Sequence, residues 1–414
     1  MYLLKHMLGS LIHRGDLIVV GPDGRHYAFG DGKPPRVTVA IADTATARRL
    51  VFNAGLALGE SYMDERFTVR DGTIYDFLDL VFANLGWTGG TRLQHFHEMM
   101  GRLGRRLLQN NRVTVARRNV AHHYDLSGEL YDLFLDADRQ YSCAYYRSPD
   151  DTLEQAQAQK KRHIAAKLCL DRPDLKVLDI GCGWGGLGLY LAEAAGATVS
   201  GITLSEEQLK VAQQRAEDAG LADRVSFRLQ DYREERGRYD RIVSVGMFEH
   251  VGVGYYRDFF RQIAELLSED GVALVHTIGR AEGPGRTNAW IRKYIFPGGY
   301  SPALSEILPV IEHAGLYVTD IEVLRLHYAE TLKAWRQRFT ANRARIARLY
   351  DERFCRLWEF YLAASEATFR HSGHINFQIQ LAKKVDALPI TRDYMIDWER
   401  AKAADAISGI RAAE

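Results

Sequence analysis

The sequence predicts an α/β protein in which a large domain, built on a mostly parallel sheet with added helices, follows a small N-terminal α+β domain. From about residue 175, apolar runs of strand length alternate with helical stretches, as in parallel strands joined by crossover helices. Before about residue 90, shorter strand-like pieces are separated by glycine-containing turns. The length of 414 residues suits two domains.

The N-terminal part alternates strand and helix signals. Residues 16–20 and 36–41 are short apolar runs, and turn-forming residues lie between them. Helical patterns follow at 44–58 and 73–85. These segments predict the small α+β unit.

A basic connector follows this unit. It carries seven arginines with little acid, namely Arg92, Arg102, Arg105, Arg106, Arg112, Arg117 and Arg118. This composition suits an anionic bilayer surface, and a solvated linker helix is an equally good interpretation.

The large domain is predicted from residue 175 onward. Strands are expected at 176–180, 198–202, 225–229, 241–245 and 271–278, with helices at 186–195, 205–219 and 255–267. The region 329–384 is expected to be mainly helical. A basic stretch lies within it, made of Lys333, Arg336, Arg338, Arg343, Arg345 and Arg348.

The overall charge excludes some classes of partner. Fifty-four Lys and Arg against 53 Asp and Glu give a formal net charge of +1, so no nucleic-acid partner is expected. The apolar start at 1–12 is short and interrupted by Lys5 and His6, which argues against a leader or spanning helix. We therefore expect a cytoplasmic protein with reduced cysteines and no metal site.

A glycine-rich turn carries the first functional signal. The strand at 176–180 contains Asp179 and runs directly into Gly181, Cys182 and Gly183. Glycine allows a ligand to approach the backbone closely, and the spacing differs from that of dinucleotide-binding turns. It is the turn used by S-adenosylmethionine methyltransferases. A purely structural strand-to-helix turn is the alternative.

The ends of the next two strands offer polar groups for the same ligand. Thr203 ends the second strand, where many such enzymes have an acid, so Thr203 and Gln208 are expected to bind the ribose. Ser205 capping the next helix, with Gln208 three residues on, is an equally complete explanation. Asp231 and Tyr232 follow the third strand and suit the adenine, although a lone acid there is more often a cap.

Seven motifs in order carry a resemblance to a known family. They are His122-His123-Tyr124-Asp125-Leu126, Tyr141-Ser142-Cys143-Ala144-Tyr145, Gly181-Cys182-Gly183-Trp184-Gly185, Gly201-Ile202-Thr203-Leu204-Ser205, Met247-Phe248-Glu249-His250-Val251-Gly252, His276-Thr277-Ile278-Gly279 and Phe296-Pro297-Gly298-Gly299-Tyr300. Through them the chain resembles the cyclopropane fatty acid synthases, which are class I methyltransferases with a Rossmann-like sheet. The resemblance covers about 119–385. It implies three parts: a lipid or dimerisation domain at 1–90, a basic helical linker at 91–118 and a catalytic domain at 119–414.

The resemblance also implies two bound groups. S-adenosylmethionine, with S-adenosylhomocysteine as its product, would contact Tyr141, Ser142, Gly181, Gly183, Thr203, Leu204, Gln208, Asp231 and Gly246. A bicarbonate ion acting as the base would be held by the backbone of Cys143 and Ile278 and by the side chains of Glu249, His276 and Tyr328. Phe248, Trp290, Tyr294, Phe296 and Tyr300 are expected to line an acyl slot.

The chemistry explains these residue types. Attack of an alkene on a sulfonium methyl leaves a carbocation, and a ring closes only if a weakly nucleophilic base removes a proton. Each residue also has an ordinary explanation. Glu249 could complement a helix dipole, His276 could be a core histidine, and the aromatic residues could be packing. Cys143 has no local histidine and acid partner, so a nucleophilic role is not expected.

The expected reaction is therefore cyclopropane formation on a phospholipid acyl chain, by a homodimer bound peripherally to the inner face of the membrane. The connector arginines and the basic segment 333–356 are the expected anionic-lipid surfaces. Three alternatives stay open: an enzyme that makes methyl- or methylene-branched chains, a small-amine N-methyltransferase, and an inactive lipid-binding protein.

Overall fold

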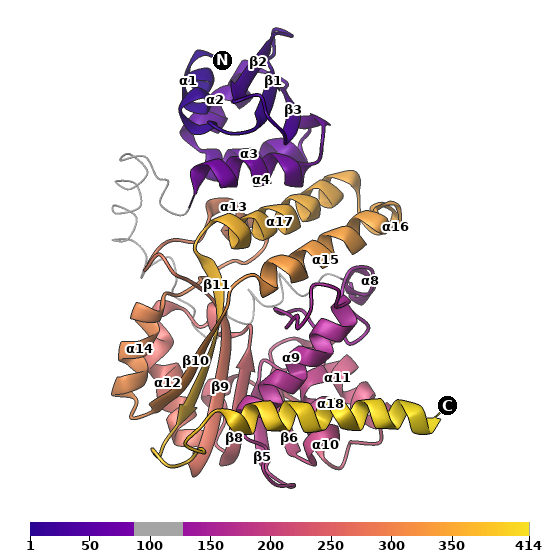
Figure 1. Ribbon diagram of the computed structural model, residues 1–414, viewed down its shortest axis with the longest axis vertical. Coiled ribbons are helices and arrows are strands. Elements are labelled where there is room, and N and C mark those ends of the chain that lie inside the picture. Colours follow the sequence, from indigo (N-terminus) through magenta and orange to yellow (C-terminus); the bar gives the residue numbers. More distant parts are fainter. Residues whose placement is uncertain (87–126, 414) are drawn as a thin grey trace.

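The computed structural model describes residues 1–86 and 127–413, and side chains up to residue 404. The connector arginines, the linker at 91–118 and the His122 motif lie outside the described residues. Figure 1 shows the described chain as two units, with the N-terminal unit at one end and the C-terminal helix at the other.

The N-terminal unit is a four-stranded sheet packed with helices. Its strands, in the order β2-β1-β3-β4, are β1 (Asp16–Val20), β2 (His26–Gly30), β3 (Arg36–Ile41) and β4 (Phe67–Asp71). Its helices are α1 (Tyr2–Leu11), α2 (Thr44–Phe52), α3 (Ala54–Met63) and α4 (Ile74–Leu85). The single helix expected at 44–58 is wrong, because Asn53 leaves helical geometry (φ −149°, ψ 51°) and separates α2 from α3.

The second unit is built on a seven-stranded sheet in the order β10-β11-β9-β8-β5-β6-β7. Its strands are β5 (Lys176–Ile180), β6 (Thr198–Thr203), β7 (Val225–Leu229), β8 (Tyr239–Val245), β9 (Leu267–Arg280), β10 (Tyr317–Leu324) and β11 (His374–Ala382). The pairs from β9 to β7 are parallel, and β11 is antiparallel to both β9 and β10. The predicted class, a mostly parallel methyltransferase sheet with added helices, is confirmed.

The region 329–384 is mainly helical, as expected, but it also contains a strand. Helices α15 (His327–Ala341), α16 (Arg343–Leu349) and α17 (Glu352–His371) occupy most of that range, but β11 begins at His374. Its nine residues, HINFQIQLA, mix apolar and polar side chains that are nearly all buried. Polar and apolar residues alternate along β11 from His374 to Leu381, which is the two-residue period of a strand, so the sequence carried a strand signal that the expectation of helix missed.

Helices cover both faces of the large sheet. One face packs on α9 (Leu153–Lys167), α10 (Gly186–Ala195) and α11 (Glu206–Asp218). The other packs on α12 (Tyr256–Leu266) and α14 (Leu304–His313). Adjacent residues of one strand, Val177 and Leu178, enter these two different cores, as the two-residue repeat of a strand requires.

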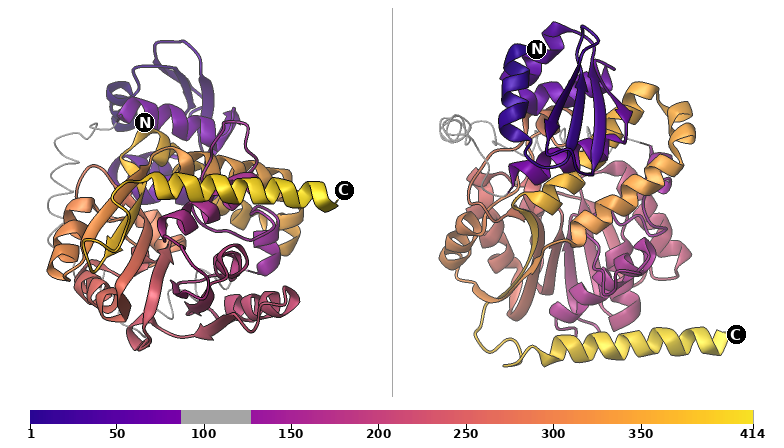
Figure 2. Two further views of the ribbon diagram at one scale, coloured as in Figure 1. Left: turned by 60° about the horizontal axis from the view of Figure 1, so that its bottom comes forward. Right: turned by 45° about the horizontal axis from the view of Figure 1, so that its top comes forward.

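The remaining elements surround the sheet. They are α8 (Gly128–Asp132), α13 (Ala289–Tyr294), α18 (Asp393–Ala413) and three short 3₁₀ turns, η1 (Tyr232–Glu234), η2 (Phe248–His250) and η3 (Val253–Tyr255). Helices α15 and α17 lie between the sheet and the N-terminal unit, which rests on α17 and α13 through α4 and α3 (Figures 1 and 2). Helix α18 packs on α9 at the far end of the molecule.

Candidate active site

The glycine turn opens one wall of a cavity. β5 ends at Ile180, and Gly181 and Gly183 both adopt positive φ angles, of 83° and 55°. A Cβ at Gly181 would lie 2.9 Å from the Cβ of Met247, so a side chain is excluded there by sterics as well as by conformation. α10 then begins at Gly186, and the backbone of the turn is left facing the cavity.

All nine residues expected to contact the cofactor line this one cavity. They are Tyr141, Ser142, Gly181, Gly183, Thr203, Leu204, Gln208, Asp231 and Gly246. They come from the loop before α9 and from the carboxyl ends of four adjacent strands. Ligands of open α/β sheets bind at this edge.

Three of these polar residues, Thr203, Gln208 and Asp231, also make structural contacts. Thr203 Oγ1 donates to Gln208 Oε1 at 3.1 Å, and Ser205 Oγ accepts from the backbone of Gln208 at 3.3 Å. Asp231 caps η1 and pairs with Arg233 at 2.7 Å. Capping and cavity lining therefore coexist at these positions.

Lys160 is a cavity residue that the sequence analysis missed. It is 1% exposed on α9, and its ammonium donates to Gln140 Oε1 at 2.6 Å and to Ser142 Oγ at 2.8 Å. Within the described part of the chain, no carboxylate lies within ion-pair distance of it. Burial lowers the pKa of Lys160 to about 8. Lys160 lies among many polar and charged residues, which is typical of a solvent-exposed helix, so the sequence does not indicate that it is buried in a cavity.

Asp179 is the acidic counterpart in the same cavity. Its side chain is 2% exposed, and Oδ2 has no hydrogen-bond partner among the described residues. Burial raises the pKa of Asp179 to about 7. The cavity thus offers one buried acid and one buried base to a ligand that carries both charges.

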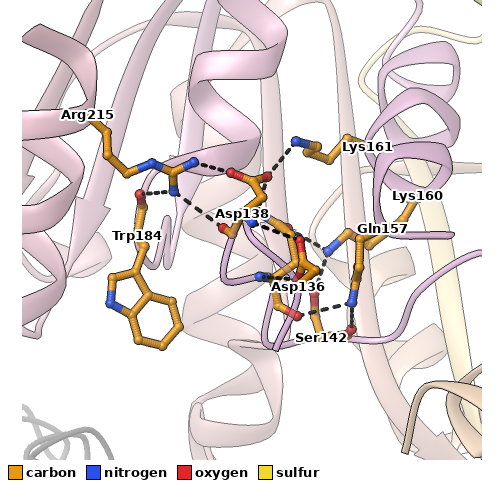
Figure 3. Close-up of polar contacts among 9 residues, drawn as sticks. Asp136, Asp138, Ser142, Gln157, Lys160, Lys161, Trp184 and Arg215 are labelled. Atoms are coloured by element: carbon orange, nitrogen blue, oxygen red, sulfur yellow. Dashed lines mark hydrogen bonds and ion pairs between the residues drawn. The ribbon is translucent and has the colours of Figure 1, made fainter. Parts of the chain in front are cut away.

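A polar network fixes the loop that carries Tyr141 and Ser142 (Figure 3). Gln157 Nε2 donates to the carbonyls of Gln140 and Ser142, at 3.1 and 3.0 Å. Asp138 binds Lys161 at 2.5 Å and also pairs with Arg215. This loop is therefore held from α9 and α11 before any ligand binds.

A second cavity adjoins the first. The two share Tyr141, Ser142, Gly246 and His250 in their walls. The second cavity is lined by all five residues expected to hold the base, Cys143, Glu249, His276, Ile278 and Tyr328, and by two of the expected acyl-slot residues, Phe296 and Tyr300. Its position relative to the first cavity suits a substrate that receives a group from the ligand there.

Glu249 and Ile278 contact each other directly. The backbone N–H of Ile278 donates to Glu249 Oε1 at 2.5 Å, so in this structure that N–H serves the carboxyl group. Burial raises the pKa of Glu249 to about 7, against the lowering effect of this hydrogen bond. Glu249 Oε2 is buried without a hydrogen-bond partner among the described residues.

His276 is buried on β9 and is neutral. Burial lowers its pKa to about 3. Its Nδ1 lies 3.2 Å from Gln378 Nε2, while Nε2 is buried with no partner in the described part of the chain. Among the described residues, the wall of the second cavity therefore carries three buried polar atoms without a hydrogen-bond partner, namely Glu249 Oε2, His276 Nε2 and Asn376 Oδ1.

Cys143 contributes no reactive thiol. It is 1% exposed, burial raises the pKa of its thiol, and its Sγ donates only to the carbonyl of Ala144 at 3.4 Å. A nucleophilic cysteine needs a lowered pKa and a base bonded to its thiol, whereas the Cys143 pKa is raised and, among the described residues, its thiol bonds only to a backbone carbonyl.

The comparisons with known proteins agree with this geometry. The sequence profile described as "Mycolic acid cyclopropane synthetase" matches residues 111–379. The "Cyclopropane-fatty-acyl-phospholipid synthase" of Escherichia coli is 37% identical over 88% of this chain and 95% of its own length. The chain belongs to the mycolic acid cyclopropane synthetase family. It is accordingly an S-adenosylmethionine-dependent methyltransferase.

Two other relatives extend this comparison. A "Probable fatty acid methyltransferase" of Pseudomonas putida is 44% identical over 67% of this chain and 73% of its own length. A solved mycolic acid cyclopropane synthase in complex with SAH is 33% identical and has a TM-score of 0.61, covering 64% of this chain and 97% of its own. Membership of the cyclopropane synthetase family supports S-adenosylmethionine binding by the first cavity.

Three residues expected in the acyl slot of this cyclopropane synthetase family member lie elsewhere. Phe248 packs in the core against Tyr256, Phe259 and Phe260. Trp290 points toward the N-terminal unit, where its Nε1 donates to Met63 Sδ at 3.3 Å. The remaining residue, Tyr294, donates its hydroxyl to Glu60 Oε1 at 3.0 Å.

The physical reason is helical geometry. Trp290 and Ile291 are adjacent on α13, so they point about 100° apart. Ile291 lines the second cavity, while Trp290 contacts α3 at Gly59, where any Cβ would collide with the indole. The prediction named the aromatic Trp290 as an acyl-slot residue, but its aliphatic neighbour Ile291 lines the second cavity.

The basic stretch expected at the membrane surface is largely paired. Arg336 pairs with Glu366 at 2.9 Å, Arg338 with Glu154 at 2.7 Å, and Arg345 with Glu129 at 2.7 Å. Lys333 and Arg343 also have acidic partners. Much of this charge is therefore neutralised within the protein. Within the described residues, no helix has the length and apolar composition needed to cross a bilayer.

Proposed function

We propose that this protein transfers a methylene group from S-adenosylmethionine to the cis double bond of an unsaturated acyl chain in a membrane phospholipid, forming a cyclopropane ring. The observation that carries the proposal is the second cavity. It adjoins the first cavity, is walled by Ile291, Phe296 and Tyr300, and carries the unused polar atoms of Glu249 and His276.

The first cavity has the charges needed for the amino-acid end of S-adenosylmethionine. Lys160 and Ser142 would bind its carboxylate, and Asp179 would bind its ammonium group. A ligand carboxylate would give the buried Lys160 a counter-charge. The polar groups of Thr203, Gln208 and Asp231 then remain for the nucleoside, which places the sulfonium near the shared wall.

The proposed reaction proceeds through a carbocation on the acyl chain. The alkene π electrons form a bond to the methyl carbon while the carbon–sulfur bond breaks, and its electron pair leaves with S-adenosylhomocysteine. The other alkene carbon becomes cationic. Loss of a proton from the added carbon frees the electron pair that closes the ring. The protein must therefore hold the double bond in line, exclude water and place a base beside the added carbon.

The second cavity suits a bicarbonate ion in that role. Bicarbonate would supply a base too weakly nucleophilic to capture the cation. Glu249, His276 and Tyr328 would hold it, with the backbone of Cys143. The Ile278 N–H would act indirectly, since it binds Glu249. The field of the buried Lys160, which lowers the pKa of His276, favours an anion here.

The proposed setting is the inner membrane face of a bacterial cell, with the enzyme acting peripherally, as a homodimer, on anionic phospholipid. The domain division at 1–90, 91–118 and 119–414 belongs to the same proposal, with the first part serving lipid binding or dimerisation. Its support is the coverage of the Escherichia coli relative, which extends over 88% of this chain.

A second candidate function is methyl or methylene branching of the same acyl chain. It is favoured by the 44% identity to a relative described as a fatty acid methyltransferase. The two reactions share the cation and differ in which proton leaves. A small amine is a weaker alternative substrate, because it has no acyl chain to fill the proposed slot.

The deciding experiment is gas chromatography with mass spectrometry of fatty acids. The full-length protein is incubated with S-adenosylmethionine, bicarbonate and vesicles of anionic phospholipid bearing a monounsaturated chain. A product that gains one methylene and co-elutes with a cyclopropane standard supports the proposal, as does dependence on bicarbonate. A branched product moves the assignment to the second candidate. No lipid product, despite bound cofactor, rejects both.

A further inference from the structure

Gln378 is the polar side chain that contacts the ring of His276. It lies on β11 directly opposite His276 of β9, as Cα partners in the antiparallel register, so the two side chains share one face of the sheet. Both are buried, with Gln378 0% and His276 1% exposed. The Gln378 Nε2 and His276 Nδ1 atoms are 3.2 Å apart.

This contact determines where the histidine proton lies. In the orientation that the structure gives the Gln378 amide, its nitrogen faces His276 Nδ1; an amide nitrogen only donates, so Nδ1 accepts and a neutral imidazole carries its single hydrogen on Nε2. Burial keeps His276 neutral, since its pKa is lowered to about 3. The Nε2–H is buried without a partner in the described part of the chain, and His276 lines the second cavity.

Core packing alone is a poor explanation of Gln378. Its Oε1 has no hydrogen-bond partner among the described residues, and burying an unpaired amide oxygen destabilises the folded state. An aliphatic side chain of similar size would avoid this cost. The amide is thus justified by what its nitrogen does for His276.

We propose that Gln378 is a positioning residue that fixes the Nε2–H tautomer of His276, so that the histidine presents a hydrogen-bond donor to the anion in the second cavity. This rests on the proposed function for the identity of that anion. The tautomer itself is a property of the protein. Asn376, two residues earlier on β11, lines the same cavity, so this strand supplies side chains to the site.

The charged groups around His276 leave this assignment intact. Glu249 faces the same cavity but makes its hydrogen bond to Ile278. Lys160, Lys167, His163 and Glu322 influence His276 through their fields, and no hydrogen bond joins any of the four to its ring among the described residues. Only Gln378 contacts Nδ1 there.

The test is nitrogen-15 NMR of histidine-labelled protein, with the His276 signals assigned from a His276→Gln spectrum. The wild type is expected to show Nε2–H. In Gln378→Glu, the carboxylate accepts from Nδ1–H and reverses the tautomer, and product formation should fall by about 10²-fold or more. In Gln378→Leu, the tautomers mix and activity should fall by about 10–100-fold.

A matched control lies on the same strand. Gln380 is also buried but donates to the Lys167 carbonyl and to the Tyr394 hydroxyl, away from His276. Gln380→Leu should keep the His276 tautomer. S-adenosylhomocysteine affinity, measured by calorimetry, should change less than about threefold in both Gln378 variants, which shows that they remain folded.

Two results would overturn the proposal. One is an Nδ1–H tautomer in the wild type, and the other is an unchanged tautomer in a folded Gln378→Glu protein. Both readouts are independent of the lipid product. If wild-type protein makes no cyclopropane ring while the tautomer still follows residue 378, the proposed function fails and this assignment stands.

Discussion

The backbone N–H of Ile278 donates to Oε1 of Glu249 at 2.5 Å, so one carboxyl oxygen is engaged and the other is buried without a partner among the described residues. This arrangement orients the carboxyl group between β9 and η2. Glu249 also lines the second cavity, and burial raises its pKa to about 7. The first two predictions depend on it.

Replacement of Glu249 by Gln should abolish most product formation and spare cofactor binding. The amide keeps the size of the side chain but cannot accept a proton, so turnover should fall by about 10²–10⁴-fold. Glu249 does not line the first cavity, so calorimetric affinity for S-adenosylhomocysteine should be retained. A large loss of that affinity would place Glu249 in the cofactor site instead.

The same variant should change the pH dependence of stability. The pKa of Glu249 is raised from 4.5 to about 7, so its favourable contribution to folding is complete below pH 4.5 and is lost as pH rises through about 7. Glu249→Gln should therefore gain stability relative to wild type with increasing pH, by on the order of 3 kcal/mol at pH 8. Denaturant unfolding at pH 5 and pH 8 measures this. An equal difference at both pH values would contradict it.

Replacement of Lys160 by Met should weaken binding at the amino-acid end of the cofactor. Loss of a buried charge-assisted contact costs about 1.5–3 kcal/mol, or about 10–100-fold in affinity for S-adenosylhomocysteine. An analogue without the carboxylate should lose much less. Lys161→Met is the matched control, because Lys161 pairs with Asp138 and does not line the cavity. If S-adenosylhomocysteine and the analogue lost affinity equally, Lys160 would act only by holding the loop that carries Tyr141 and Ser142.

Replacement of Cys143 by Ser should lower activity only modestly. The thiol is buried, its pKa is raised, and the proposed role of this position belongs to its backbone. Product formation within about tenfold of wild type is expected, since serine adds a buried hydroxyl but keeps the backbone. Complete loss in a protein that still binds S-adenosylhomocysteine would show that the thiol has a chemical role.

Replacement of Trp290 should affect mainly the stability of the protein, whereas replacement of Ile291 should affect mainly its substrate preference. Trp290→Ala removes an indole that packs on α3 and should cost about 3–5 kcal/mol of unfolding free energy. Ile291→Ala enlarges the second cavity and should change the preference among acyl-chain lengths. Thermal unfolding and competition between vesicle lipids of different chain length measure the two effects. If Trp290→Ala changed the chain-length preference and Ile291→Ala changed mainly stability, Trp290 would be assigned to the acyl slot.

The sequence alone determined the five parallel strands of the central sheet and nine of the residues that line the first cavity. β5 and β7 begin and end where their apolar runs predict, and α10 begins beside the predicted glycine turn. The nine expected cofactor residues share one cavity because they sit in or beside loops at the carboxyl ends of adjacent strands, and topology then brings them together. The five residues expected to hold the base were predicted from the family resemblance, and the structure likewise brings them together in one cavity.

Tertiary structure decided the rest. Gln378 lies on β11, whose alternating sequence indicates a strand but not the residue that faces Gln378 across the sheet. Lys160 lies on α9, whose many polar and charged residues give no sign that it is buried, so neither role follows from local pattern. Whether Trp290 or Ile291 faces the cavity depends on the rotation of α13 against α3, which is set by contacts more than 200 residues apart in sequence. Local periodicity determines which residues are buried, but only packing determines what each buried group faces.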